Sequence, residues 1–188
     1  MSITFGEHIP GLQLQGRPVR GTVFNEQQVR AAAGITLALA AFAFVQAWLA
    51  QRYAPIKWVT AFFFIEFVLR SVAGLRGSPV GWLAARLVAR QSPLWVSAAP
   101  KRFAWTLGVV MSGAMTAITQ WDVRGAVPLT ICVICMTLMW LETALGVCLG
   151  CEIYRVAVRR GLVKVDDAFE VCTHGSCSLA APPQSRAQ

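Results

Sequence analysis

Long uncharged stretches constrain the fold of this chain more than any other feature. Residues 31–51 and 103–121 carry no charge, and Glu142 is the single charged residue within 125–151. A helix of about 20 apolar residues crosses a hydrocarbon layer of about 30 Å. A fourth stretch, residues 58–75, is rich in Phe, Val and Leu, and we include it as a span although it contains Glu66 and Arg70. We therefore predict four spans, at about 31–51, 58–75, 103–121 and 126–151.

Composition favours a membrane protein over other classes. Of the 188 residues, 56% are hydrophobic and 14% are charged, which is unusual for a soluble domain. The net charge of +8 comes mostly from basic residues beside the spans, without a motif for base or phosphate recognition. We therefore predict the lipid bilayer as a partner, and no nucleic acid. Residues 1–25 lack the apolar core of a signal peptide, so the first span is expected to remain in the mature protein.

The distribution of Lys and Arg predicts the orientation, because cytoplasmic loops collect basic residues. One side would hold Arg17, Arg20, Arg30, Arg76, Arg86, Arg90, Lys101, Arg102, Arg155, Arg159, Arg160 and Lys164. The other side would hold Arg52, Lys57 and Arg124. This asymmetry places both the N- and the C-terminus in the cytoplasm.

The connection between the second and third spans has a helical pattern of its own. In residues 80–91, Leu83 and Leu87 share one face, and Arg86 and Arg90 share another. We expect an amphipathic helix on the membrane surface, the alternative being a re-entrant helix packed against protein. The predicted fold class is thus an all-α membrane protein with four transmembrane helices and a cytoplasmic interfacial helix. Its parts are an N-terminal segment, 1–28, a membrane domain, 29–160, and a flexible tail, 161–188.

Three charged residues inside the spans are candidate functional residues. Glu66 and Arg70 stand four apart, so one helical turn brings them together. They predict either an internal ion pair or a proton or anion site. Glu142 has no basic residue within a turn of its own helix, so its partner would be Arg70, Lys101 or Arg102, unless it stays protonated. We regard Glu142 as a candidate for proton handling.

The six cysteines form three close pairs. Cys148 and Cys151 lie where the fourth span is expected to meet the cytoplasm, with Lys101 and Arg102 at the same membrane face. Because nearby cations favour the thiolate, these two basic residues are predicted to stabilise it or to bind an anion. Redox exchange, metal binding and a purely structural role all remain open for this pair. Cys132 and Cys135 are expected to be apolar packing residues.

Metal binding has weaker candidates in the tail, which contains Cys172, His174 and Cys177. Thiolate and imidazole ligands suit zinc or copper(I). Cys132 and Cys135 cannot share an ion with Cys148 and Cys151 on one continuous helix, because 16 residues span about 24 Å. The sequence does not identify a cofactor.

Two runs carry a resemblance. APKRFA, residues 99–104, and CLGCEIY, residues 148–154, resemble a bacterial four-helix membrane family of unknown function, the domain-of-unknown-function 4395 family. Arg70 and the Ser78-Pro79 turn also look like family positions, so the resemblance extends over about 25–161. It implies a multi-pass protein of the bacterial inner membrane, and a thioredoxin-like or rhodanese-like partner. The run CVIC, 132–135, is also similar to the vitamin K epoxide reductase type, but neither predicted outer loop contains the additional cysteines of that type.

Two function hypotheses follow, and they differ in class. In the first, Cys148 and Cys151 perform thiol redox or sulfane-sulfur chemistry. In the second, the chain is a non-catalytic scaffold or an accessory subunit that joins other membrane subunits. Small-molecule or metal transport is a third hypothesis, and it is motivated by the charged residues inside the spans. No phosphate loop, haem motif or catalytic triad is visible, so whether the chain is an enzyme is left open.

Overall fold

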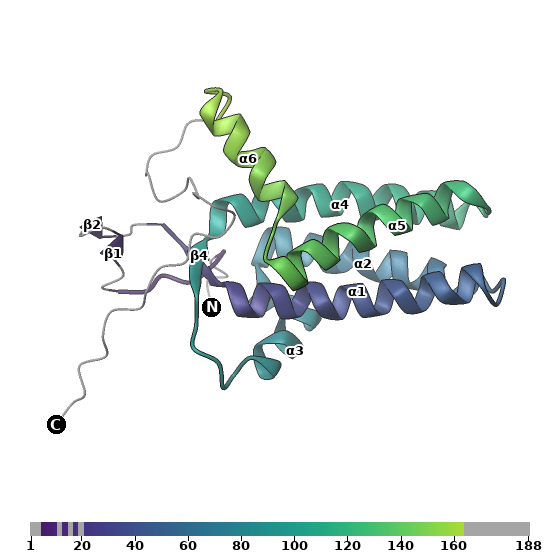
Figure 1. The fold of residues 1–188 in the computed structure, drawn as a ribbon, viewed down its shortest axis with the longest axis horizontal. Coiled ribbons are helices and arrows are strands. Elements are labelled where there is room, and N and C mark those ends of the chain that lie inside the picture. Colours follow the sequence, from purple (N-terminus) through teal and green to yellow (C-terminus); the bar gives the residue numbers. More distant parts are fainter. Residues whose placement is uncertain (1–4, 11–12, 15–16, 19–20, 164–188) are drawn as a thin grey trace.

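Four long helices form the body of the molecule, and the chain folds back and forth along one axis (Figure 1). The computed structural model describes residues 5–10, 13–14, 17–18 and 21–163. The long helices are α1 (Glu26–Trp48), α2 (Ala54–Ala73), α4 (Ala98–Gln120) and α5 (Ala126–Trp140). The π-helical segment η2 (Leu141–Leu145) continues α5, and α6 (Leu149–Arg159) follows after a break.

Short elements gather at one end of this bundle. Strands β3 (Val23–Asn25) and β4 (Trp95–Ser97) pair antiparallel, with Phe24 opposite Val96, and each leads directly into a long helix. The turn η1 (Leu75–Gly77) and helix α3 (Pro79–Leu87) follow α2 on the same end. Strands β1 (Gln13–Leu14) and β2 (Arg17–Pro18) form a second antiparallel pair. The β3–β4 pair ties the starts of α1 and α4 together, because both helices begin at the residue after a paired strand.

The packing of the bundle uses small residues and hydroxyls. Gly108 of α4 lies against the ring of Phe67, where a Cβ atom would come within 2.6 Å of the ring. The hydroxyls of Thr60 and Thr119 hydrogen-bond between α2 and α4 at 3.0 Å. Close approach through glycine and hydroxyl contacts is typical of helices that associate within a membrane. Two apolar clusters fill the interior, one around Phe24, Phe67 and Trp105 and one toward the opposite end around Ile56, Met115 and Leu129.

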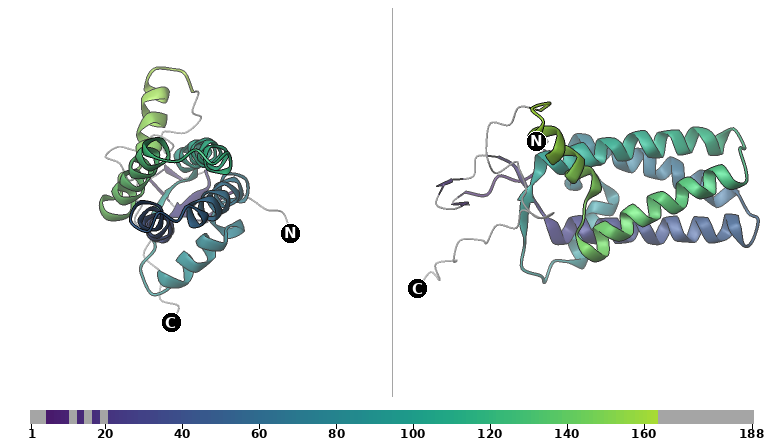
Figure 2. Two further views of the ribbon diagram at one scale, coloured as in Figure 1. Left: turned by 90° about the vertical axis from the view of Figure 1, so that its right-hand side faces the viewer. Right: turned by 45° about the horizontal axis from the view of Figure 1, so that its top comes forward.

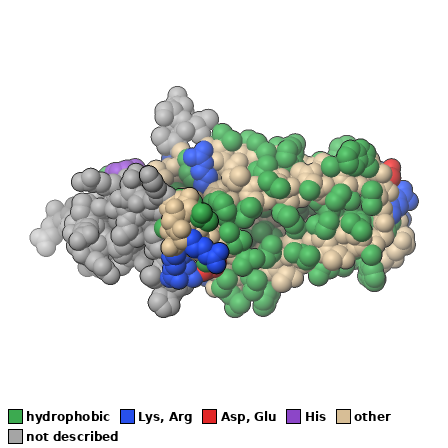
Figure 3. Space-filling view, turned by 90° about the horizontal axis from the view of Figure 1, so that it is seen from above, with side chains coloured by type: hydrophobic (Ala, Val, Ile, Leu, Met, Phe, Trp, Pro, Cys, Tyr) green, Lys and Arg blue, Asp and Glu red, His purple; other side chains and the backbone are tan. Residues whose placement is uncertain are grey.

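The outer surface of the bundle is apolar. In Figure 3, hydrophobic side chains cover most of the visible flank, and charged side chains gather near the two ends. Exposed residues on the flank include Phe42, Ile65 and Val110, which are 55%, 59% and 64% exposed. Glu26–Trp48 and Ala126–Leu145 are long and apolar enough to cross a membrane, judged by length and composition. The prediction of a helical protein with such segments is confirmed.

The helices depart from the predicted spans at their ends. Helix α1 begins five residues before the predicted 31–51, because Asn25 caps it by accepting a hydrogen bond from the backbone of Gln27. A helix is observed in the predicted region 80–91, but it is shorter than predicted, because α3 ends at Leu87. The expectation of a continuous helix over 126–151 was wrong. The chain breaks at Gly146, whose φ of 68° is a left-handed conformation that glycine adopts without steric cost.

Candidate functional site

The position of Cys148 and Cys151 depends on the break after η2, because a new helix begins at these cysteines. Cys148 is the N-cap of α6, and its Sγ atom accepts a hydrogen bond from the backbone N–H of Cys151 at 3.4 Å. The Cys151 thiol donates to the same sulfur, and the two Sγ atoms lie 2.6 Å apart. Both residues are buried free thiols. A disulfide of about 2.05 Å therefore requires little movement of either side chain.

Contact and burial control the protonation of Cys148. The hydrogen bond with Cys151 and the loss of solvent hold the pKa of the Cys148 thiol well above its ordinary value of 9.0. The positive charge of Lys101 opposes this rise, and the negative charge of Glu142 adds to it. Contact and burial therefore favour the protonated form of the reduced Cys148 thiol.

The two motifs of the chain contact each other directly. Gly150, between the cysteines, lies so close to Ala104 that an added Cβ would come within 2.6 Å of the Ala104 Cβ and 2.8 Å of its Cα. The rings of Phe103 and Tyr154 pack at a centroid separation of 5.8 Å. Helix α6 is thus seated on the first turns of α4. This contact brings the APKRFA and CLGC runs together from positions about 45 residues apart in the chain.

A buried cluster of three charges lies beside the thiols. The Nζ atom of Lys101 is 2.6 Å from Glu142 Oε1 and 3.1 Å from Glu26 Oε2. All three side chains are buried, and they come from α4, η2 and the first turn of α1. Burial disfavours the charged ammonium of Lys101, and the two carboxylates beside it offset that cost. The prediction of a basic partner for Glu142 from a neighbouring helix is confirmed, and the partner is Lys101.

Glu26 and Arg30 were missed by sequence reasoning. The predicted first span began at residue 31, so both were assigned to the cytoplasmic flank. In the structure Glu26 points into the charge cluster, and its Oε1 atom is buried without a hydrogen-bond partner among the described residues. Arg30 donates to the carbonyl oxygens of Thr143 and Ala144, at 3.0 and 2.9 Å. The available signal was Asn25-Glu26, a capping residue followed by an acidic first-turn residue.

Arg102 does not join the cluster. Its side chain is exposed, and its guanidinium lies over the ring of Phe5 at 4.9 Å from the centroid. The two neighbouring basic residues therefore differ, since Lys101 points into the protein and Arg102 points out. That Lys101 stabilises a thiolate stays a prediction, and it is motivated by the charge of Lys101 acting on Cys148 and Cys151.

Glu66 and Arg70 form a separate buried network, and the predicted ion pair is confirmed at 2.8 Å. Glu66 Oε1 also accepts a hydrogen bond from the hydroxyl of Ser78. Arg70 donates to Thr36 at 3.2 Å, and Ser78 caps α3 by accepting from the backbone of Gly81 at 2.8 Å. The network joins α1, α2 and α3, as expected of a structural ion pair with mutual partners.

The other cysteines lie outside this site. Cys132 and Cys135 are half-buried free thiols on α5, and Cys132 packs against the apolar cluster toward the opposite end. No group of three or more His, Cys, Asp or Glu side chains that could hold a metal occurs within the described ranges. The metal candidates Cys172, His174 and Cys177 lie outside the described residues. So does nearly all of the predicted tail, 161–188.

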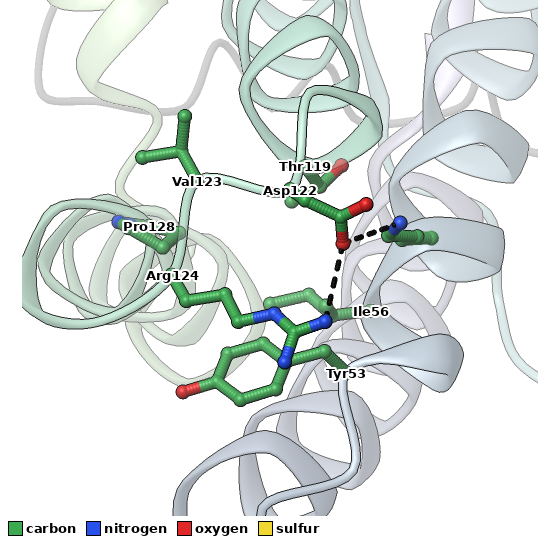
Figure 4. A pocket seen from close by; sticks show the side chains of 8 residues that line it. Tyr53, Ile56, Thr119, Asp122, Val123, Arg124 and Pro128 are labelled. Atoms are coloured by element: carbon green, nitrogen blue, oxygen red, sulfur yellow. Dashed lines mark hydrogen bonds and ion pairs between the residues drawn. The ribbon is translucent and has the colours of Figure 1, made fainter.

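A small hollow occurs at the far end of the bundle (Figure 4). Asp122 lines it and lies 2.7 Å from Lys57 Nζ and 3.4 Å from Arg124 Nη2. The hydrogen bonds from Lys57 and Arg124 lower the pKa of Asp122. These three residues belong to the loop end of α2 and to the α4–α5 connection, away from α6. The hollow is therefore distinct from the thiol site.

Comparison with known proteins identifies the family of the chain. Neither the curated proteins nor the solved structures give a significant match. A family model, described as a domain of unknown function (DUF4395), matches residues 24–159. This range includes all three residues of the charge cluster and both cysteines of the thiol pair. Because the match covers most of the sequence, the chain belongs to the DUF4395 family, as the two motifs predicted.

Proposed function

We propose that this chain is an integral inner-membrane protein in which Cys148 and Cys151 cycle between a dithiol and a disulfide. The observation that carries the proposal is the 2.6 Å approach of the two sulfur atoms at the N-terminus of α6. A Cys pair separated by two residues at the start of a helix is a common arrangement for thiol–disulfide exchange. The close approach of the two sulfur atoms favours this chemistry over sulfane-sulfur handling, because a single S–S bond between Cys148 and Cys151 converts the dithiol into the disulfide.

The membrane placement is supported by the outer surface of the bundle. Helices α1, α2 and α4 contain 23, 20 and 23 residues, enough to cross about 30 Å of hydrocarbon, and α5 with η2 contains 20. Trp48, Trp58 and Trp121 are 55%, 78% and 80% exposed near the loop end, as in an aromatic belt. We therefore propose four spans, with the end that carries α3 and α6 in the cytoplasm because it holds most of the basic residues.

The chemical step is a two-electron exchange. One thiol loses its proton and attacks a disulfide of a partner protein, forming a mixed disulfide and releasing one partner thiolate. The second thiol then attacks, so that the Cys148–Cys151 disulfide forms and the partner is released with two thiols. The pair is oxidised, the partner is reduced, and two protons pass from the pair to the partner or solvent. A thioredoxin-like protein is the class of partner we propose.

The charge cluster supplies a proton site for this step. Two carboxylates around one ammonium leave one negative charge in excess when all three residues are ionised. One of the two carboxylates can therefore accept the proton that is released when a thiolate forms. The ammonium group of Lys101 then lies near the negative charge of that thiolate. We assign Glu142 to proton handling and Lys101 to stabilisation of the thiolate. The raised pKa of Cys148 disfavours the free dithiolate, so the pair is suited to donating electrons and remaining oxidised afterwards.

A redox titration of the full chain in membranes tests the proposal. Protein is equilibrated at defined dithiothreitol potentials, free thiols are alkylated, and Cys148 and Cys151 are followed by mass spectrometry. We expect one two-electron transition, with about 30 mV for each tenfold change. Cys148→Ser should abolish the transition, and Cys132→Ser is the matched control that should retain it. A pair that stays reduced at every potential would exclude this function.

One observation favours the scaffold alternative, namely the close packing of Gly150 against Ala104. Under this alternative the CLGC run packs the end of α4 and has no redox role. Cys148→Ser would then reduce assembly of the protein without any loss of a redox transition. Blue native electrophoresis of the variant, run beside the titration, separates the two functions.

A further inference from the structure

Helix α6 has an apolar stripe that no described element covers. Leu149, Ile153 and Val156 recur at helical spacing and are 49%, 46% and 44% exposed. The opposite face is packed, because Cys151 is buried and Tyr154 contacts Phe103. The stripe is therefore the outward face of α6, and the inner face of this helix packs against α4.

The position of α6 matches that of a helix lying along a surface. Seen along the bundle, α6 projects sideways from the four long helices (Figure 2, left). It does so at the end that also carries β4 and α3 (Figure 1). The chain leading into it exposes Leu145 and Val147, at 59% and 36%. The apolar surface of α5 and η2 is thus continuous with the stripe of α6.

Basic residues lie at the end of the helix. Arg159 and Arg160 are exposed, and Arg159 lies in the last turn. An amphipathic helix with arginines beside its apolar face suits a bilayer interface that contains anionic lipid, because the guanidinium groups complement the phosphates. A protein groove would also cover apolar residues, but it would not account for continuity with a flank that faces hydrocarbon.

We propose that α6 lies in the cytoplasmic interface of an anionic lipid bilayer. Leu149, Ile153 and Val156 enter the boundary between headgroups and acyl chains, and Arg159 and Arg160 contact lipid phosphates. This inference rests on the membrane placement proposed above, but it does not depend on the redox chemistry. Its consequence is that Cys148 and Cys151, at the start of α6, are held at headgroup level, so a partner protein must reach them at the membrane surface.

Photo-crosslinking in the full chain tests this placement. The photoreactive amino acid p-benzoylphenylalanine is introduced at Ile153 in protein reconstituted into nanodiscs of mixed phosphatidylglycerol and phosphatidylcholine. Adducts are identified by mass spectrometry after illumination. Position 42, where Phe42 faces outward on α1, reports the membrane placement itself, and position 154 is the inward-facing control on α6. We expect lipid adducts at positions 42 and 153, and adducts within the chain at position 154.

The outcomes separate the two proposals. Lipid adducts at position 42 with protein adducts or none at position 153 would overturn the inference and leave the membrane placement standing. Failure at both positions would overturn both. Replacing Arg159→Gln or Arg160→Gln should lower the ratio of anionic to zwitterionic adducts at position 153 by about fivefold for each arginine. An unchanged ratio would contradict the role of anionic lipid.

Discussion

The Nζ atom of Lys101 lies 2.6 Å from Oε1 of Glu142, and the two side chains meet from α4 and η2 in the buried interior of the bundle. Glu26 shares the same ammonium group at 3.1 Å. Buried ion pairs contribute little compared with an apolar core, but removal of one partner leaves an uncompensated buried charge. Lys101 should therefore be the most sensitive position of the cluster.

Replacement of this lysine predicts a large loss of stability. Lys101→Met leaves two carboxylates without a cation, and we expect the free energy of unfolding to fall by about 3–5 kcal/mol. Urea unfolding in detergent measures the change. The triple variant with Lys101→Met, Glu26→Gln and Glu142→Gln should recover most of the loss, because no unpaired charge remains.

A matched control is available at the other end of the bundle. Lys57 also pairs with a carboxylate, that of Asp122 at 2.7 Å, but the two side chains are 28% and 55% exposed. Exposed pairs contribute little to stability, so Lys57→Met should change the free energy of unfolding far less than Lys101→Met. Equal losses for the two lysines would contradict the burial argument.

A second prediction concerns Ser78, which joins the Glu66–Arg70 pair to α3. Its hydroxyl donates to Glu66 and accepts from the backbone N–H of Gly81. Ser78→Ala removes the cap and one donor, and should cost about 1–3 kcal/mol. Hydrogen exchange in α3 should accelerate more than in α4. Ser71→Ala is the control, because that hydroxyl donates within its own helix, and an equal effect there would argue against the network.

The sequence predicted the parts of this structure that depend on local pattern. Uncharged stretches predicted helices α1, α4 and α5, and the spacing of Glu66 and Arg70 predicted their ion pair, because one helical turn determines that distance. Orientation from basic residues placed Lys101 at the same end as Glu142, so Lys101 was one of three candidates. These inferences needed no knowledge of which helices are neighbours.

The features that were missed depend on contacts between distant parts of the chain. The break at Gly146 is stabilised by Arg30, whose guanidinium binds the carbonyls at the end of η2 from 113 residues away. The sequence pattern does not reveal that contact, so the apolar run 126–151 was predicted to be one continuous helix. The β3–β4 pair is three residues long on each side, too short to have a recognisable period. Glu26 entered the cluster because that pair and the Asn25 cap set the start of α1.

A third prediction tests the contact between the two motifs. Gly150→Ala places a Cβ atom 2.6 Å from Ala104 Cβ, closer than packed atoms allow, so α6 must shift from α4. We expect slower formation of the Cys148–Cys151 disulfide and faster alkylation of both thiols. Gly34→Ala is the comparison, because its Cβ would meet a Thr143 methyl at 3.1 Å, which a small adjustment relieves. Disulfide formation at the wild-type rate in Gly150→Ala would show that the close packing of α6 against α4 is not required for disulfide formation.

The raised pKa of Cys148 predicts how the stability of the reduced protein depends on pH. In the unfolded chain this thiol ionises near its ordinary value of 9.0, whereas contact with Cys151 and burial keep it protonated in the folded protein. Above that pH the folded state binds more protons than the unfolded state, so the free energy of unfolding falls as pH rises. The contribution is fully present below the unfolded pKa, and its loss is at most about 1.4 kcal/mol for each pH unit above it.

Urea unfolding of the reduced protein in detergent, between about pH 7 and about pH 10, measures this loss. Cys148→Ser removes the titrating thiol at nearly constant volume and should show a shallower decline over the alkaline part of the range. The difference between the two curves isolates Cys148, because every other titrating group is common to both proteins. Superimposable curves would mean that Cys148 ionises equally in both states, and the conclusion that the folded protein favours the protonated Cys148 thiol would then have to be abandoned.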